Sequence, residues 1–166
     1  MTTALLVVAT GKYIDFVPQL LLSADRYLRD SDGVQYVVYS DAPSLDSVDS
    51  STRQTHLRPV HHIAWPFPTL LRHHFFSSDA EFLRQFDRLL YCDVDMRFVD
   101  EFDAENLLTE LTAVRHPGFP DGHTSTPPFE QSRDSACYIS ATPGDIYVAG
   151  GLQGGATDAY LEACSR

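Results

Sequence analysis

Two aspartates, Asp93 and Asp95, follow directly after the apolar run at residues 89–92. Carboxylates at the end of a buried strand are costly to leave unpaired, so they require a cation, hydrogen-bond donors or water. Oxygen ligands of this kind suit hard divalent cations, which also bind phosphate groups. The pattern indicates a metal site that handles phosphates, with a strand running out into a solvated acidic loop as the alternative.

Thr10-Gly11-Lys12-Tyr13 and Arg72 are further candidates for binding an anionic ligand. The first segment lacks the spacing of a P-loop. It predicts either a turn that offers backbone groups and the Tyr13 ring to a nucleobase or an ordinary turn. Arg72 lies near the start of a predicted helix, where it either faces a diphosphate or is a surface arginine.

His116-Pro117-Gly118 and the glycine-rich run at residues 150–155 each follow a predicted strand. The imidazole of His116 either hydrogen-bonds a sugar hydroxyl or is a partly buried structural group. The glycines either let a bulky ligand approach the backbone or make a tight turn into the last helix.

Hydrophobic periodicity predicts the strands and helices that position these residues. Strands are predicted at residues 5–9, 34–39, 56–63, 88–92, 111–114 and 146–149. Helices are predicted at residues 17–28 with Asp15 as N-cap, 69–86 with Thr69 as N-cap, 103–111 and 156–164. This order is typical of an α/β sheet, in which ligands bind beyond the carboxyl ends of the strands.

The composition restricts the class of protein. At 166 residues the chain suits one globular domain, residues 1–166. A formal net charge of −11 with a single lysine, Lys12, excludes the basic surface of a nucleic-acid binder. No apolar run approaches the roughly 20 residues that cross a bilayer, so we expect a cytoplasmic protein with no membrane segment. Cys92, Cys137 and Cys164 are too few and too widely spaced to predict a disulfide framework or a zinc site.

Three motifs together resemble glycosyltransferase family 6, the ABO blood-group and α-1,3-galactosyltransferase family. They are Leu90-Tyr91-Cys92-Asp93-Val94-Asp95-Met96-x-Phe98, His116-Pro117-Gly118-Phe119, and Gly144-Asp145-x-Tyr147-x-x-Gly150-Gly151-x-x-Gly154-Gly155. The resemblance extends to Lys12-Tyr13 with Phe16, and to Trp65 with Thr69 and Arg72.

The resemblance implies a GT-A-type nucleotide-binding fold with a mostly parallel central sheet flanked by helices. It implies a retaining α-1,3-glycosyltransferase that moves GalNAc or galactose from UDP-GalNAc or UDP-Gal to the 3-hydroxyl of a terminal galactoside. Asp93 and Asp95 match the pair that holds Mn2+, or another divalent cation, on the diphosphate. His116 matches the histidine that binds the acceptor.

The resemblance also assigns a set of residues to the nucleotide and donor sugar. They are Val8, Ala9, Thr10, Tyr13, Thr69, Arg72, Asp93, Val94, Ala149, Gly150 and Gly151. Ala149-Gly150-Gly151 falls on the segment that selects the 2-substituent of the donor, and small residues there favour GalNAc over galactose. The preference is modest, since such a pocket discriminates by about 1 to 3 kcal/mol.

The chain departs from the family pattern in two ways. Asp93-Val94-Asp95 replaces the Asn-x-Asn of many bacterial relatives, which places the chain with the metal-dependent branch. The family's C-terminal part, with its His-Asp-Glu segment and catalytic glutamate, does not follow the last helix, so no catalytic residue is identified and Glu162 is not a substitute. We expect a soluble bacterial or phage-encoded protein in C-terminally truncated form.

Two alternatives accompany this interpretation. One is a catalytically inert module that retains UDP-sugar binding, because the catalytic glutamate is missing. The other is a haloacid-dehalogenase-type phosphatase, which also carries Asp-x-Asp after an apolar strand. The second fits poorly, because that chemistry requires the pair near the start of the domain and a Lys or Arg downstream to stabilise the phosphoaspartate. Here the pair lies at residues 93–95, Lys12 lies upstream, and the residues that follow directly are Met96-Arg97.

Overall fold

The computed structural model describes residues 1–46, 51–120 and 124–166. These residues form two compact units, one made of Met1–Thr112 with Gly151–Arg166 and the other of Ala113–Gly150. No helix in the described part of the chain is both long and apolar enough to cross a membrane. The sequence predicts that residues 1–166, which include both units, form one domain, and this stays a prediction.

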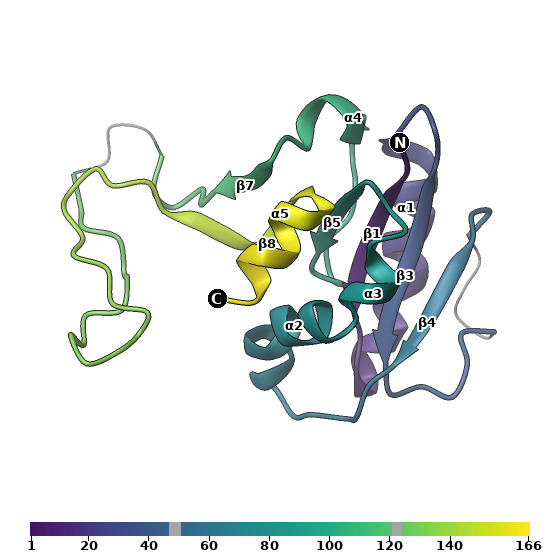
Figure 1. Cartoon of the computed structure of the whole chain (residues 1–166), viewed down its shortest axis with the longest axis horizontal. Coiled ribbons are helices and arrows are strands. Elements are labelled where there is room, and N and C mark those ends of the chain that lie inside the picture. Colours follow the sequence, from purple (N-terminus) through teal and green to yellow (C-terminus); the bar gives the residue numbers. More distant parts are fainter. Residues whose placement is uncertain (47–50, 121–123) are drawn as a thin grey trace. The chain divides into compact units, whose positions relative to one another are not determined.

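A mostly parallel sheet forms the centre of the fold (Figure 1). In the described residues it has six strands in the order β4-β3-β1-β5-β8-β7. Neighbours among β1, β3, β4 and β5 pair in parallel, whereas β8 is antiparallel to β5. The strands of this sheet are β1 (Thr3–Val8), β3 (Val34–Ser40), β4 (Thr55–Pro59), β5 (Arg88–Cys92), β7 (Leu111–Arg115) and β8 (Val148–Ala156). The predicted α/β fold with a mostly parallel sheet flanked by helices is confirmed, and it matches the GT-A type.

Helices cover both faces of the sheet. They are η1 (Gly11–Phe16, a 3-10 helix), α1 (Val17–Tyr27), α2 (Phe67–Ser78), α3 (Ala80–Leu83), α4 (Ala104–Leu107) and α5 (Thr157–Cys164). Figure 1 shows α1 on one face and α2, α3 and α5 on the other. The remaining strands, β2 (Leu28–Arg29) and β6 (Phe102–Asp103), form a separate parallel pair.

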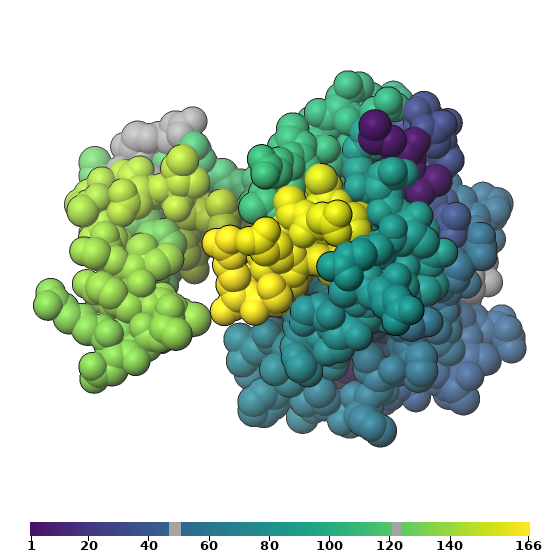
Figure 2. Space-filling model, in the orientation of Figure 1, coloured from purple at the N-terminus to yellow at the C-terminus, as the bar shows by residue number. Residues whose placement is uncertain are grey.

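Strand β1 is buried on both of its faces, so its sequence is apolar throughout. Leu5 and Val7 pack with α1 in one core cluster. Leu6 and Val8 pack on the other face with Phe76 of α2 and with side chains of α3 and α5. Helix α5, yellow in Figure 2, lies on the surface beside α2. The central sheet is therefore fixed from both sides.

Helix α1 begins later than its predicted N-cap, Asp15, because the preceding residues already coil into η1. The N-cap position is Phe16, and Pro18 lies in the first turn. Gly11, at the start of η1, has a φ of 56°. A glycine adopts this left-handed conformation without the steric cost that a side chain would bring.

A single helix over residues 69–86 was the wrong prediction, because two helices occupy this segment. Helix α2 begins at Phe67 after Pro66, so Thr69 lies inside the helix and its N–H bonds to the carbonyl oxygen of Pro66 at 3.1 Å. The break between the two helices falls at Asp79, whose carboxylate accepts a hydrogen bond from Nε of Arg58 at 2.7 Å. The helix predicted at 103–111 is also too long, since α4 ends at Leu107.

The glycine-rich run lies within strand β8 and not in a turn, so of the two alternatives for this run the tight turn into the last helix is wrong. The reason lies in the close approach of β8 to β5. A Cβ on Gly154 would stand 2.2 Å from the carbonyl oxygen of Leu89 and 3.0 Å from Cα of Leu90. A side chain at this position would force the two strands apart.

Gly154→Ala is therefore expected to destabilise the protein by about 1 to 3 kcal/mol, the usual cost of overpacking a rigid site. The contact is with backbone atoms of β5, which cannot move aside as a flexible side chain does. Urea unfolding followed by circular dichroism measures the change. A variant with the wild-type unfolding midpoint would contradict the close strand packing.

Candidate functional site

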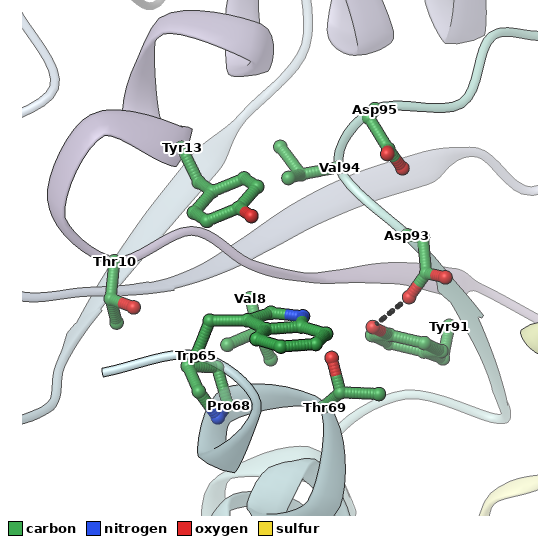
Figure 3. A pocket seen from close by; sticks show the side chains of 10 residues that line it. All are labelled: Val8, Thr10, Tyr13, Trp65, Pro68, Thr69, Tyr91, Asp93, Val94 and Asp95. Atoms are coloured by element: carbon green, nitrogen blue, oxygen red, sulfur yellow. Dashed lines mark hydrogen bonds between the residues drawn. The ribbon is translucent and has the colours of Figure 1, made fainter. Parts of the chain in front are cut away.

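A pocket opens beyond the carboxyl ends of β1 and β5 (Figure 3). Three segments form its walls: the end of β1 with η1, the start of α2, and the end of β5 with the residues that follow. The lining residues are Val8, Thr10, Tyr13, Trp65, Pro68, Thr69, Tyr91, Asp93, Val94 and Asp95. Because β1 and β5 are adjacent and parallel, segments distant in sequence meet at this edge of the sheet.

Aromatic rings dominate one part of the pocket. Figure 3 shows the rings of Tyr13, Trp65 and Tyr91 around the same space, with the hydroxyl of Thr69 beside them. Trp65 is 72% exposed, which is high for so large an apolar side chain. Flat apolar surfaces with a few polar groups between them are typical of a site for a small cyclic ligand.

Asp93 and Asp95 line the same pocket, and Asp93 lies beside Tyr91 (Figure 3). The hydroxyl of Tyr91 donates to Oδ1 of Asp93 at 2.5 Å, and a nitrogen of Arg72 lies 3.6 Å from the same oxygen. The Asp93 side chain nevertheless stays 37% exposed, and Asp95 is exposed. Burial, and then the neighbouring Asp93 carboxylate, raise the pKa of the Tyr91 hydroxyl well above its ordinary value. The phenol therefore remains a donor at neutral pH.

Asp93 and Asp95 have the chemistry of a partial site for a divalent cation. Both carboxylates line the same pocket, and oxygen ligands suit Mg2+ and similar ions. Nowhere in the described part of the chain do three or more His, Cys, Asp or Glu residues gather in a metal-binding arrangement. A cation here would complete its coordination with water and with phosphate oxygens of a ligand, as Mg2+ commonly does.

Most of the nucleotide and metal residues assigned from the sequence meet in this pocket. These are Val8, Thr10, Tyr13, Thr69, Asp93, Val94 and Asp95. Ala9 is fully buried, packs in the core cluster on the α1 face, and accepts a hydrogen bond from the Ser40 hydroxyl through its carbonyl oxygen. Arg72 is 8% exposed and lies behind the pocket wall, with its guanidinium carbon 4.8 Å from the centre of the Tyr91 ring.

Gly151 lies beside Asp93. Its carbonyl oxygen accepts the backbone N–H of Asp93 at 2.8 Å. A Cβ on Gly151 would stand 2.8 Å from Oδ2 of Asp93 and 3.3 Å from the sulfur of Met96. The space that the missing side chain leaves is therefore occupied by the Asp93 carboxylate.

The second unit contains His116, Ala149 and Gly150, the other residues assigned from the sequence. His116 is half-buried, and its ring Nδ1 accepts from the backbone N–H of Gly118 at 3.0 Å. This bond leaves Nε2 as the protonated nitrogen of the neutral ring. Phe119 and Tyr147 pack against the imidazole, with ring centres 5.7 and 5.5 Å away. His116 is thus held by an aromatic cluster within its own unit.

Tyr91 and Pro68 line the pocket although the sequence assigned them no role there, and Trp65 entered only as part of the resemblance. The position of Tyr91 could have been predicted from the two-residue repeat of side-chain direction in a strand. Side chains two residues apart point to the same face, so Tyr91 shares a face with Asp93. Tyr91 also belongs to the apolar run at residues 89–92, which by itself predicts only a buried side chain.

Comparison with known proteins identifies relatives along nearly the whole chain. The family model "Glycosyltransferase family 6" matches residues 1–165. The chain is 30% identical over 159 residues to the Histo-blood group ABO system transferase 1 of Rattus norvegicus, covering 93% of this chain and 45% of the relative. It is 29% identical over 161 residues to the Globoside alpha-1,3-N-acetylgalactosaminyltransferase 1 of Gallus gallus, covering 93% of this chain and 46% of the relative.

A bacterial relative is also found. The chain is 24% identical over 154 residues to the O-antigen biosynthesis glycosyltransferase WbnI of Escherichia coli, covering 92% of this chain and 65% of the relative. The chain thus spans about half the length of the rat and chicken relatives and about two thirds of the bacterial one.

His73, on α2 behind the site, makes stability depend on pH. Burial, and then the positive charge of Arg72, lower the pKa of His73, while its hydrogen bond with Gln153 opposes the shift. Below the unfolded-state pKa of about 6.5, the unfolded chain therefore binds a proton more readily than the folded one. The free energy of unfolding falls as the pH drops from this value through the folded pKa.

His73→Gln is expected to reduce the loss of thermal stability between pH 7 and pH 5, because no proton is then taken up at this position on unfolding. Differential scanning calorimetry at several pH values measures the slope of the melting temperature against pH. His74→Gln, at the exposed neighbouring position, is the matched control. Equal slopes for wild type and His73→Gln would contradict the assignment.

Proposed function

The chain belongs to glycosyltransferase family 6, and from this premise we propose that it serves the transfer of GalNAc or galactose from a UDP-sugar to a terminal galactoside, with Mn2+ on the diphosphate. The observation that carries the proposal is the meeting of Asp93 and Asp95 with Tyr13 and Trp65 in one pocket. Such a pocket offers stacking surface for a base and oxygen ligands for a cation. A UDP-sugar with a divalent cation requires both.

The names of the relatives support sugar transfer as the reaction class. The rat relative is named as a histo-blood group transferase and the chicken relative as an α-1,3-N-acetylgalactosaminyltransferase. The chicken relative's name favours transfer to the 3-position and GalNAc as the donor sugar. Ala149 and Gly150 are small residues, which agrees with a donor that carries an N-acetyl group.

The residues of the pocket have separate roles in this proposal. Tyr13 and Trp65 bind the uracil ring, and Thr10 and Thr69 offer hydroxyls to the polar parts of the nucleotide. Asp93 and Asp95 hold the divalent cation, which neutralises charge on the leaving diphosphate when it is bound. His116, in the second unit, presents a ring N–H to an acceptor hydroxyl.

Asp93→Asn combined with Asp95→Asn is expected to remove the Mn2+-dependent part of UDP binding. Amide groups carry no charge and are poor substitutes for carboxylates on a hard cation. Isothermal titration calorimetry with UDP, in the presence of Mn2+ and again of EDTA, measures the difference. The control is Asp100→Asn with Glu101→Gln, which changes the net charge equally at exposed positions outside the pocket. Unchanged binding in the Asp93 and Asp95 variant would refute the metal assignment.

A UDP-sugar-binding module without turnover is the second candidate function. It is favoured by one observation: in the described part of the chain, the acidic residues that line the pocket are Asp93 and Asp95, and both are assigned to the cation. No further carboxylate of the pocket is left to act on the reacting carbon.

Incubation with UDP-GalNAc, Mn2+ and a β-galactoside acceptor separates the two functions. We expect a product that carries one added N-acetylhexosamine, detected by mass spectrometry, and a smaller yield with UDP-Gal. UDP binding by calorimetry without any such product would support the binding module instead. The absence of both would count against the nucleotide site itself.

A further inference from the structure

The Asp93 carboxylate is held from several sides. Its Oδ1 accepts the Tyr91 hydroxyl at 2.5 Å, drawn as a dashed line in Figure 3. Its Oδ2 lies over Gly151, 2.8 Å from the position that a Cβ would take there. Its backbone N–H bonds to the carbonyl oxygen of the same glycine at 2.8 Å. The Tyr91 hydrogen bond therefore sets the direction of the side chain, and the missing Cβ of Gly151 leaves the room that this direction needs.

Arg72 lies close to the Asp93 carboxylate but does not form a hydrogen bond with it. Its nearest nitrogen is 3.6 Å from Oδ1 of Asp93, which is beyond hydrogen-bond distance. Its guanidinium lies over the Tyr91 ring at 4.8 Å, and its Nε has no hydrogen-bond partner in the described part of the chain. The positive charge of Arg72 offsets the negative charge of Asp93. The guanidinium also packs against the Tyr91 ring, whose hydroxyl donates to Asp93.

The same three residue types occur a second time in this fold, which provides an internal comparison. The Tyr39 hydroxyl donates to Asp79 at 3.0 Å, and Arg58 binds that aspartate with two hydrogen bonds of 2.7 and 2.5 Å. Asp79 is thus fully paired, and its side chain is 17% exposed. This group has the features of a structural ion pair.

The group at Asp93 differs in how it is completed. At Asp93 the tyrosine makes a hydrogen bond and the arginine makes none, and the Asp93 side chain is 37% exposed and lines the pocket. One tyrosine hydroxyl therefore sets the orientation of a carboxylate whose remaining lone pairs are available to a ligand. Second contacts of this kind orient metal ligands in many proteins.

We propose that Tyr91 is a positioning residue that presets Asp93 for binding a divalent cation, with Arg72 behind its ring. The inference rests on the proposed function and adds to it a residue that does not touch the cation. A carboxylate held in one rotamer loses little conformational freedom when the ion binds. Without the hydroxyl, Asp93 retains its charge but not its fixed direction.

Tyr91→Phe tests the inference, because it removes the hydroxyl and keeps the ring that packs on Phe76. We expect the affinity for Mn2+, titrated calorimetrically in the presence of UDP, to fall about 10-fold or more, the lower range for a lost ligand-orienting contact. UDP binding in EDTA should change far less than the Mn2+ affinity, because the ring that lines the pocket is retained. A general structural defect would weaken both.

Tyr39→Phe is the matched control. It removes the same atom from a tyrosine that also packs on Phe76 and also donates to an aspartate, away from the pocket. It should lower the melting temperature yet leave the Mn2+ affinity unchanged. If Tyr91→Phe and Tyr39→Phe had equal Mn2+ affinities, the inference would be overturned while the proposed function stood.

Gly151→Ala provides a second route that leaves Tyr91 intact. Its methyl group would press on Oδ2 of Asp93 and turn the carboxylate away from the hydroxyl. We expect weaker Mn2+ binding, and an effect smaller than additive when the change is combined with Tyr91→Phe, since both act on the same orientation. If the effects of Gly151→Ala and Tyr91→Phe on the free energy of Mn2+ binding were strictly additive, the inference would be overturned. Wild-type protein with no Mn2+-dependent UDP binding would overturn the metal assignment and the inference together.

Discussion

Backbone pairing of β1 with β5 sets Leu6 beside Tyr91, and this register determines which side chains meet at the edge of the sheet. The parallel direction brings the ends of both strands to the same edge. A shift of one residue would turn Tyr91 to the opposite face of the sheet, away from Phe76 and Arg72. Burial of β1 on both sides makes such a shift costly, because every side chain of the strand would then face the wrong cluster.

The two faces of the sheet differ in chemistry as well as in position. The face toward α1 is mainly aliphatic, whereas the face toward α2 and α5 is rich in aromatic rings, among them Tyr39, Phe76, Tyr91 and Tyr160. A tyrosine buries its ring and carries a hydroxyl at its end. Tyr39 and Tyr91 thus extend from the core to aspartates at its border. The core and the polar edge of the site are continuous for this reason.

Much of the fold could be predicted from local patterns. Continuous apolar runs identified β1, β3 and β5, and they also predicted that Asp93 lies at the end of β5. The break at Asp79 was missed because its cause, the contacts with Arg58 and Tyr39, is tertiary. The extent of β8 was missed because glycine has low intrinsic strand preference, and only the close approach to β5 explains it there.

The position of Arg72 shows a different limit. The sequence predicted that Arg72 lies on a helix near the site. The direction of its long side chain, however, depends on the groups that it can pack against. Here it lies over the Tyr91 ring behind the pocket wall. Position along a helix predicts the face a residue occupies, whereas the partner is decided by the fold.

Trp65 gives the pocket a property that no other part of the chain shares. It is the single tryptophan among the 166 residues, it is 72% exposed, and it lines the pocket itself. Indole fluorescence depends on how much water surrounds the ring. Tryptophan emission from this protein therefore originates at the wall of the pocket, and the molecule carries its own optical probe of occupancy without any label.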